Sequence, residues 1–319
     1  MSEKSPVIID LKFDPETVTR VLKGAFADRE VLNMADPAVR KRDLSGVSYA
    51  VLWNPDADLF SRAPDLKVLF SGGAGVDRIL SLPSLPDIPI VRFVDHTLTT
   101  RMSEWVMLQC LWHLRQGDRY ARAQQAHHWE ELDQPQASDL TVGVMGLGVL
   151  GQDAVRKLKV MGFDVIGWSR TQKSIDGIET FDAAGLDSFL SRSDILVGLL
   201  PLTPETTGFY NAALFSKLRQ GGALGRPVFI NAGRGRSQNE ADLARALQEG
   251  VLGGASLDVF EQEPLDAASP FWDMENVVVT PHAAAASDTR ALFRNVEAQI
   301  ARFERGEALE HLVDRSRGY

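Results

Sequence analysis

The sequence predicts an α/β protein of two doubly wound domains, each a parallel sheet with helices on both faces. Its 319 residues are more than one hydrophobic core usually serves, so two domains are expected. Short apolar runs alternate with helical patterns along the chain, which is typical of parallel sheets. A glycine-rich turn follows one of these runs and opens a helix, which is typical of the Rossmann-like form of this fold.

The first hundred residues contain one α/β unit. Asp14 can cap a helix that has Pro15 in its first turn, and apolar residues recur at helical spacing from Val18 to Phe26. Strand patterns separated by turns that contain proline or glycine lie at residues 6–9, 49–53, 68–70 and 90–93.

The rest of the chain repeats the alternation. Strands are expected at residues 142–145, 164–168, 195–200, 228–231, 254–259 and 277–280, and helices at 186–190, 212–218 and 241–247. The helix at 101–115 is too apolar to face solvent, so burial between domains or subunits is expected. The polar stretch 119–139 lacks a regular pattern and is expected to be functional or interfacial. A last helix, at about 288–304, is expected to return to the first domain.

The glycine-rich turn has the spacing G-x-G-x-x-G, with glycines at Gly146, Gly148 and Gly151. Such glycines permit a tight turn, let the backbone approach a pyrophosphate and let the helix pack on the strand. Glycines also occur in ordinary turns, so the motif alone is weak. Here a strand precedes it, and an amphipathic helix and a second strand follow it. The whole pattern therefore predicts a dinucleotide site.

Composition excludes several other classes of protein. A net charge of −9 without a basic block argues against general binding of nucleic acid or anionic membranes. The single cysteine, Cys110, excludes an intramolecular disulfide and a cysteine metal site, which fits a reducing cytoplasm. No signal pattern opens the chain, and no apolar run is long enough to cross a bilayer. The pair His127 and His128 lacks further ligands, so no metal site is expected.

Three chemically useful side chains follow three of the later strands: Arg234, Glu263 and His282. Taken singly, each is most simply a loop residue. Together, beside a dinucleotide site, they suit hydride transfer to a ketone, because an acid must protonate the developing alkoxide. Histidine can be that acid, and a neighbouring carboxylate favours its charged form. A guanidinium can bind a carboxylate next to the carbonyl, so the combination predicts a 2-oxo acid substrate.

The turn after the strand at 164–168 indicates which dinucleotide binds. An NAD site usually has an acidic residue there for the ribose hydroxyls, whereas an arginine accommodates a 2′-phosphate. This chain has no carboxylate there but has Ser169, Arg170 and Lys173. A solvated basic turn is the plainer interpretation. Two cations at one turn of an acidic protein nevertheless favour NADPH.

The chain resembles the D-isomer-specific 2-hydroxyacid dehydrogenase family, and in particular its glyoxylate/hydroxypyruvate reductase A branch. The matching stretches lie in order at residues 70–77, 102–104, 146–151, 200–206, 231–235, 256–264 and 281–282. The resemblance implies that Arg234, Glu263 and His282 are catalytic. It also implies that backbone N–H groups around Ala74, Gly75 and Val76 hold the substrate carboxylate, and that Arg234 and His282 bind the substrate as well. Trp53 either walls the substrate pocket or is a core residue.

The resemblance also implies a domain plan and a cofactor site. A substrate-binding domain of residues 1–100 and 286–319 and a dinucleotide-binding domain of residues 101–285 would enclose the active site in a cleft that closes on substrate. The helix after residue 101 and the arm after 119 match the region through which the family forms dimers, so a homodimer is expected. Besides the basic turn, the implied cofactor residues are Gly146, Gly148, Val149, Leu150, Gly151, Leu200, Pro201, Thr206, Ala232, Gly233, Arg234, Asp258, His282 and Ala284.

Two departures from the family pattern and three alternative functions are noted. Residues 221–227 form a longer turn than usual, expected at the surface, and alanines at 283–286 replace a glycine-containing sequence. A phosphoglycerate dehydrogenase would often have an extra regulatory domain, and a formate dehydrogenase would need a smaller pocket. A non-catalytic dinucleotide sensor would not need the three polar side chains. The expected function is NADPH-dependent reduction of small 2-oxo acids, with glyoxylate and hydroxypyruvate as leading substrates.

Overall fold

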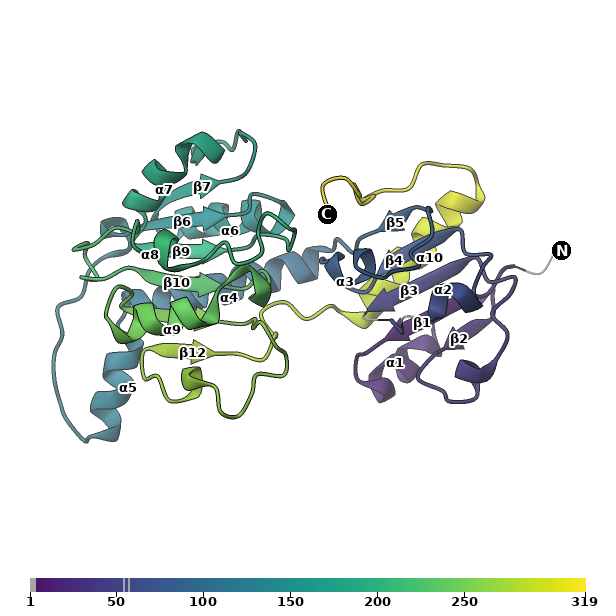
Figure 1. Cartoon of the computed structure of the whole chain (residues 1–319), viewed down its shortest axis with the longest axis horizontal. Coiled ribbons are helices and arrows are strands. Elements are labelled where there is room, and N and C mark those ends of the chain that lie inside the picture. Colours follow the sequence, from purple (N-terminus) through teal and green to yellow (C-terminus); the bar gives the residue numbers. More distant parts are fainter. Residues whose placement is uncertain (1–3, 54, 57) are drawn as a thin grey trace. The chain divides into compact units, whose positions relative to one another are not determined.

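The structure is a computed structural model that describes residues 4–53, 55–56 and 58–319. The chain divides into two compact units, one of Met1–Leu98 with Ser287–Tyr319 and one of Thr99–Ala286 (Figure 1). Residues 1–3, which the sequence assigns to the first domain, lie outside the described residues. The chain therefore passes from one unit to the other between residues 98 and 99 and between residues 286 and 287. The sequence analysis places these boundaries between 100 and 101 and between 285 and 286.

The first unit contains a five-stranded parallel sheet in the order β2-β1-β3-β4-β5. This order reverses direction after β1, as in doubly wound folds. The strands are β1 (Val7–Leu11), β2 (Val31–Asn33), β3 (Tyr49–Trp53), β4 (Val68–Ser71) and β5 (Ile90–Val91). Their apolar residues are buried on both faces, as expected for parallel strands covered by helices.

Helices cover both faces of this sheet. They are α1 (Pro15–Leu22), α2 (Leu59–Arg62), α3 (Asp77–Leu80) and α10 (Thr289–Glu304), with a 3₁₀ turn η1 (Val39–Lys41). Asp14 caps α1 by accepting the Thr17 N–H at 2.9 Å, as the sequence predicts. α10 packs in this unit, where Phe293 lies against Phe26 with ring centroids 5.5 Å apart. The return of the last helix is confirmed, but α1 ends at Leu22 and does not reach Phe26, whose left-handed φ of 54° lies outside helical geometry.

The second unit contains a seven-stranded parallel sheet in the order β12-β11-β10-β9-β6-β7-β8. Beginning at β6, this is the strand order of dinucleotide-binding folds with one strand added at the edge. The strands are β6 (Thr141–Met145), β7 (Asp164–Trp168), β8 (Glu179–Phe181), β9 (Ile195–Gly198), β10 (Val228–Asn231), β11 (Gly254–Leu257) and β12 (Val277–Val279). The predicted fold class, two parallel α/β units, is confirmed.

Its helices are α4 (His96–Leu114), α5 (Gly117–Gln125), α6 (Val149–Val160), α7 (Leu186–Arg192), α8 (Ala212–Phe215) and α9 (Glu240–Gln248). The 3₁₀ turns are η2 (Ala137–Asp139), η3 (Ala183–Gly185), η4 (Gly235–Ser237) and η5 (Pro270–Trp272). Apolar side chains of α4 and α6 share one core with the sheet, and those of α7, α8 and α9 share a second core. The sheet is therefore covered on both faces.

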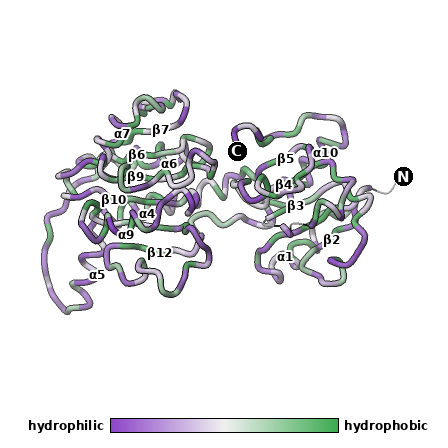
Figure 2. The backbone as a smooth tube through the Cα atoms, viewed as in Figure 1, coloured by the Kyte–Doolittle hydropathy of each residue, from purple (hydrophilic) through white to green (hydrophobic). Residues whose placement is uncertain are grey.

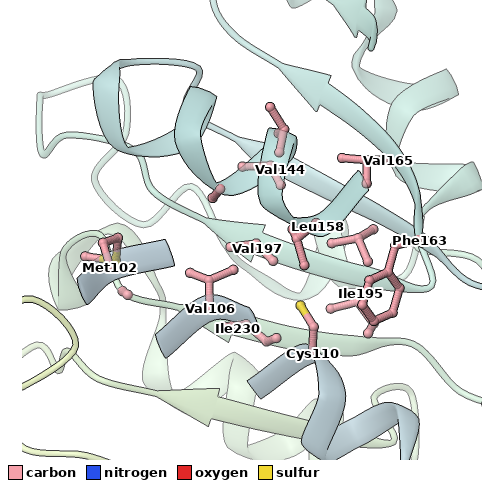
Figure 3. Packing of buried hydrophobic residues seen from close by; sticks show 14 of the residues in the cluster. Met102, Val106, Cys110, Val144, Leu158, Phe163, Val165, Ile195, Val197 and Ile230 are labelled. Carbon is pink, nitrogen blue, oxygen red and sulfur yellow. The ribbon is translucent and has the colours of Figure 1, made fainter. Parts of the chain in front are cut away.

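The apolar helix α4 is buried mainly by the sheet of this unit. Figure 3 shows Met102, Val106 and Cys110 of α4 lying against the strands β6, β9 and β10. The prediction that this helix is buried between domains or subunits was wrong for these residues, because they are needed to cover one face of the sheet. Leu108 is the apolar residue of this helix that is not covered: 58% of its surface is exposed.

Apart from the one-turn helices α2 and α3 and the 3₁₀ turns, three elements escape the sequence analysis. β2 and β8 are three-residue strands at sheet edges, too short to show a pattern. α5 occupies the start of the stretch 119–139, which the sequence describes as irregular. None of its residues is buried, so it has no apolar stripe; Figure 2 shows this segment as mainly hydrophilic and the sheet strands as mainly hydrophobic. Within the described part of the chain, no helix has both the length and the apolar character to cross a membrane.

Candidate active site

The candidate cofactor site lies where the strand order of the second unit reverses, between β6 and β9. In open α/β sheets, ligands bind at the carboxyl ends of the strands at this point. β6 ends at Met145 and leads into Gly146, and β9 ends at Gly198 and leads into Leu199. The predicted glycine turn is therefore at the position where the fold creates a ligand crevice.

Each glycine of the motif has a distinct structural reason. Gly146 has a φ of 105°, and a Cβ added there would lie 2.6 Å from the Leu199 carbonyl oxygen. A Cβ on Gly151 would lie 1.9 Å from the Gly146 carbonyl oxygen, so only glycine lets α6 approach the turn. At Gly148 no described atom lies within 4 Å of an added Cβ. The turn thus requires Gly146 and helix packing requires Gly151, whereas the backbone at Gly148 is not covered by neighbouring atoms of the described residues.

That open glycine is the N-cap of α6. Gly148 brings no side chain to bond the N–H groups of the first helical turn, and Val149 beside it is exposed. Leu150 is partly buried against the core of the unit. Unpaired N–H groups at a helix N-terminus attract phosphate through hydrogen bonds and the helix dipole. The geometry fits the pyrophosphate of a dinucleotide.

The basic turn after β7 is at the surface next to this site. Arg170 and Lys173 are exposed. Ser169 is buried, and its hydroxyl donates to the Thr171 carbonyl oxygen at 2.7 Å, so it would have to rotate to donate to a phosphate. A hydrogen bond from Thr203 and, to a smaller extent, the charge of Arg170 lower the pKa of Glu205. Arg170 therefore lies within electrostatic reach of a carboxylate.

The predicted cofactor residues after β9 and β10 form one wall. The turn after β9 is fixed by Thr206, whose hydroxyl donates to the Pro201 carbonyl oxygen at 2.7 Å. A Cβ on Gly233 would lie 2.8 Å from the Leu200 carbonyl oxygen, so the two loops touch through their backbones. Ala232 is buried beneath this contact. The structure thus brings these predicted residues together.

Arg234 is positioned by a buried amide network. Asn231, at the end of β10, donates through Nδ2 to Gln238 Oε1 at 2.8 Å and accepts the Gly233 N–H at 3.0 Å. Gln238 donates in turn to the Val259 carbonyl oxygen at 3.1 Å. Arg234 itself is half-buried and donates to the Gly233 carbonyl oxygen at 2.8 Å. The sequence analysis missed Gln238, because nothing along the chain marks it as buried.

Glu263 and His282 are in direct contact. His282 Nδ1 lies 2.9 Å from Glu263 Oε2, and the other oxygen of Glu263 accepts the Phe260 N–H at 3.1 Å. Because a carboxylate only accepts, Nδ1 carries the shared hydrogen, and Nε2 is the ring nitrogen able to exchange a proton with a reacting group. The His282 side chain is 38% exposed. Its loop follows β12, whereas Glu263 follows β11 and Arg234 follows β10, three neighbouring strands.

Asp258 lies beneath the His282 loop. It is 1% exposed, and its Oδ2 accepts the Ala284 N–H at 3.0 Å. Its Oδ1 accepts the Thr280 hydroxyl, a residue that the sequence analysis passed over. The strand register brings the two side chains together: Leu257 pairs with Val279, so the next residues of the two strands face each other, and the sequence alone does not give this register. Burial raises the pKa of Asp258, against the effect of these hydrogen bonds.

Four of the residues expected to bind substrate, Trp53, Ala74, Gly75 and Val76, lie in the first unit, whereas Arg234 and His282 lie in the second. Trp53 ends β3 and is half-buried, and a Cβ on Gly73 would lie 2.7 Å from its ring. Ser71 donates to the Gly75 carbonyl oxygen at 2.9 Å, which shapes the turn that includes Ala74. Val76 is buried at the start of α3. Trp53 therefore packs on this turn.

The remaining histidines do not join the site. His96, His127, His128 and His311 are exposed. His113, on α4, is buried, and its Nε2 lies 2.9 Å from Ser256 Oγ. This agrees with surface or packing roles. The turn at 221–227 is mostly exposed, as expected.

Comparison with known proteins identifies the family. The family model described as D-isomer specific 2-hydroxyacid dehydrogenase, NAD binding domain, matches residues 105–284. This span includes the glycine turn, Arg234, Glu263 and His282.

Solved structures extend the match to the whole chain. An NADPH-dependent glyoxylate/hydroxypyruvate reductase from Sinorhizobium meliloti, in complex with NADP and sulfate, is 67% identical, with 99% of this chain and 100% of that chain covered and a TM-score of 0.98. A probable 2-hydroxyacid dehydrogenase from Rhizobium etli, in complex with NADP, HEPES and L(+)-tartaric acid, is 66% identical, with 99% and 100% covered and a TM-score of 0.94.

A third structure is more distant. It is a D-isomer specific 2-hydroxyacid dehydrogenase from Xanthobacter autotrophicus in complex with NADPH and MES, 37% identical, with 99% of both chains covered and a TM-score of 0.92. The matched domain, the whole-chain similarity and the site geometry agree. The chain belongs to the D-isomer-specific 2-hydroxyacid dehydrogenase family, in its glyoxylate/hydroxypyruvate reductase A branch.

Proposed function

We propose that this protein reduces small 2-oxo acids to 2-hydroxy acids with NADPH, with glyoxylate and hydroxypyruvate as the leading substrates. The observation that carries the proposal is the 2.9 Å contact of His282 Nδ1 with Glu263 Oε2, in the unit that holds the glycine turn. The name and bound NADP of the Sinorhizobium meliloti relative support it. The intact pair gives this reading an advantage over a non-catalytic dinucleotide sensor.

The residues of the glycine turn fit a dinucleotide. The open backbone at Gly148 and the N-terminus of α6 would hold the pyrophosphate, and Arg170 and Lys173 would pair with a 2′-phosphate. Bound at this site, NADPH supplies the hydride. Ser169 would contribute a hydrogen bond once its hydroxyl turns away from the Thr171 carbonyl oxygen.

His282 delivers the proton in the proposed reaction. Negative charge develops on the substrate oxygen as the carbonyl is reduced, and an imidazolium within hydrogen-bond reach neutralises it. Glu263 holds the ring through Nδ1, so Nε2 faces the reaction as the donor.

Arg234 and the turn at Ala74, Gly75 and Val76 bind the substrate in this proposal. The guanidinium forms two parallel hydrogen bonds with oxygens of the 2-oxo acid and polarises its carbonyl. The turn contributes backbone N–H groups to the carboxylate. Trp53, which packs on this turn, would limit the length of the substrate side chain.

The decisive experiment replaces His282 by asparagine. Asparagine tolerates the left-handed backbone of this position but cannot donate a proton as an acid. We expect kcat with glyoxylate and with hydroxypyruvate to fall by a factor of about 10² or more, while the Kd of NADPH changes little. Arg234→Lys should lower kcat/KM because an ammonium lacks the planar fork. Near-normal turnover of His282→Asn would refute the proposed mechanism.

We infer that two copies of the chain associate. Trp129, in the arm after α5, is 93% exposed, and Leu108 of α4 is exposed as well. Large apolar side chains at the surface are typical of protein interfaces. Light scattering at micromolar concentration should give a dimer, and a monomer for the unmodified chain would contradict this inference.

The cysteine content supports a location in a reducing cytoplasm, since the chain has one cysteine among 319 residues.

A further inference from the structure

The loop that carries His282 has an unusual backbone. His282 has a φ of 53°, in the left-handed region that residues with a Cβ rarely adopt. The residues that follow are alanines, which give the loop no side-chain hydrogen bonds of their own. Such a conformation persists only where the surroundings hold it.

Hydrogen bonds to one residue hold this loop. The His282 N–H donates to the Asp258 carbonyl oxygen at 2.8 Å. The Ala283 N–H donates to Asp258 Oδ1 at 2.8 Å, and the Ala284 N–H donates to Asp258 Oδ2 at 3.0 Å. Three successive N–H groups, including that of His282, therefore end on a single aspartate.

The aspartate is itself fixed on two sides. Thr280 Oγ1 donates to Asp258 Oδ1 at 2.5 Å, and the Asp258 N–H donates to the Asn231 carbonyl oxygen at 2.9 Å. Asn231 is the residue whose side chain shapes the turn before Arg234. Asp258 thus links the loops of both proposed catalytic cations.

A buried carboxylate is costly unless hydrogen bonds satisfy it. Asp258 is almost fully buried, and burial raises its pKa, while the Thr280 hydroxyl is the strongest of the contacts that oppose this effect. Removal of that hydroxyl would weaken the charged form of Asp258, which is the form whose two oxygens can accept the Ala283 and Ala284 N–H groups at once.

We propose that Thr280 and Asp258 are positioning residues that hold His282 in the orientation needed for proton delivery, acting through the loop N–H groups. The proposal rests on the proposed function, in which His282 is the proton donor. It concerns residues that do not need to touch the substrate. Asp258 can still contact the cofactor, since its two oxygens offer about four acceptor positions. Thr280 is therefore the cleaner residue to change.

The experiment compares Thr280→Val with Thr280→Ser in the full-length protein. Valine keeps the shape and removes the donor, whereas serine keeps the donor. We expect Thr280→Val to lower kcat by about tenfold or more, as small misplacements of a catalytic group do. The Kd of NADPH, measured by fluorescence titration, should stay within about twofold. The solvent deuterium isotope effect on kcat should rise, because proton delivery becomes slower, and Thr280→Ser should restore both kcat and the isotope effect.

Thr141→Val is a matched control. Like Thr280, Thr141 is a threonine of the second unit whose hydroxyl donates to an aspartate: its Oγ1 donates to Asp164 Oδ2 at 2.9 Å, at the amino end of β6. Thr141→Val also removes a hydrogen bond from a threonine to an aspartate, but far from the strand ends that carry the site. We therefore expect kcat and the isotope effect to stay unchanged even if stability falls.

The outcomes distinguish the positioning role of Thr280 and Asp258 from the proposed function of the protein. A Thr280→Val protein with kcat within twofold of the unmodified enzyme overturns the positioning role. So does a loss that Thr141→Val reproduces, or one that the Kd of NADPH fully explains. Near-normal turnover of His282→Asn, measured in parallel, removes the proposed function instead, whatever Thr280→Val does. An inactive His282→Asn together with a normal Thr280→Val removes only the positioning role.

Discussion

His113 should make the protein sensitive to acid. It lies on α4 with 6% of its surface exposed, and its Nε2 lies 2.9 Å from Ser256 Oγ. Ser256 donates its own hydrogen to Gln109 Oε1 at 2.9 Å, so it must accept from His113, and Nε2 carries the hydrogen. Burial lowers the pKa of His113 from 6.5 to about 4. The folded protein therefore keeps the ring neutral at pH values where the unfolded chain protonates it.

The sign and size follow from this shift. Between pH 6.5 and about pH 4 the unfolded chain binds more protons than the folded one, so stability falls as the pH falls through this window. One pKa unit corresponds to about 1.4 kcal/mol, so His113 alone costs on the order of 3 kcal/mol of unfolding free energy once the pH is below the folded value. At about pH 4.5 most of this loss, roughly 2 kcal/mol, is already present.

Urea unfolding at about pH 7 and pH 4.5 measures the effect. His113→Gln has no titrating ring but can still donate an N–H to Ser256, so it should lose roughly 2 kcal/mol less than the unmodified protein between the two pH values. His128→Gln, a change at an exposed histidine, is the control and should behave like the unmodified protein. Equal losses for His113→Gln and the unmodified protein would refute the reasoning.

Three further changes test the proposed site. Arg170→Ala should lower kcat/KM for NADPH and bring it closer to that for NADH, because it removes the cation expected at the 2′-phosphate; equal or better kcat/KM with NADH in the unmodified enzyme would falsify the cofactor assignment. Glu263→Gln can still accept the hydrogen of His282 Nδ1 but carries no charge, so kcat should fall by less than in His282→Asn, and an unchanged kcat would exclude a role for the carboxylate. Gly151→Ala places a Cβ 1.9 Å from a backbone oxygen and should destabilise the protein by about 2 kcal/mol or more. Gly148→Ala should keep the Tm and weaken NADPH binding, because no atom of the described residues lies within 4 Å of the added Cβ. Equal Tm values for the two variants would contradict the different roles of these glycines.

The sequence predicts the fold well where strands are buried on both faces. β3, β7 and β10 have the predicted bounds, because continuous runs of apolar and β-branched residues mark strands covered on both sides. β8 was missed because an edge strand of three residues with an exposed glutamate has no such run. α4 was recognised as buried, but an apolar helix does not reveal whether a sheet or a second subunit covers it.

The site was predictable where a motif fixes the chemistry. G-x-G-x-x-G and the strand-end positions of Glu263 and His282 need only the order of residues along the chain. Thr280 and Gln238 were not predictable, because their roles depend on which strand lies next to which and in what register. The left-handed backbone of His282 was also hidden, since histidine does not demand that conformation.

The backbone contacts between strand-end loops determine where the chain can be recombined with a relative. Gly146 lies against Leu199, Gly233 against Leu200, and a Cβ on Gly235 would lie 1.9 Å from the Phe260 carbonyl oxygen. Each loop at the carboxyl edge thus constrains the next by hard contact, and a chimaera with one exchanged loop would meet backbone that has not changed with it. Crossover points belong at the opposite edge of the sheet, in exposed turns such as 221–226, so that all the carboxyl-edge loops can be exchanged as one block.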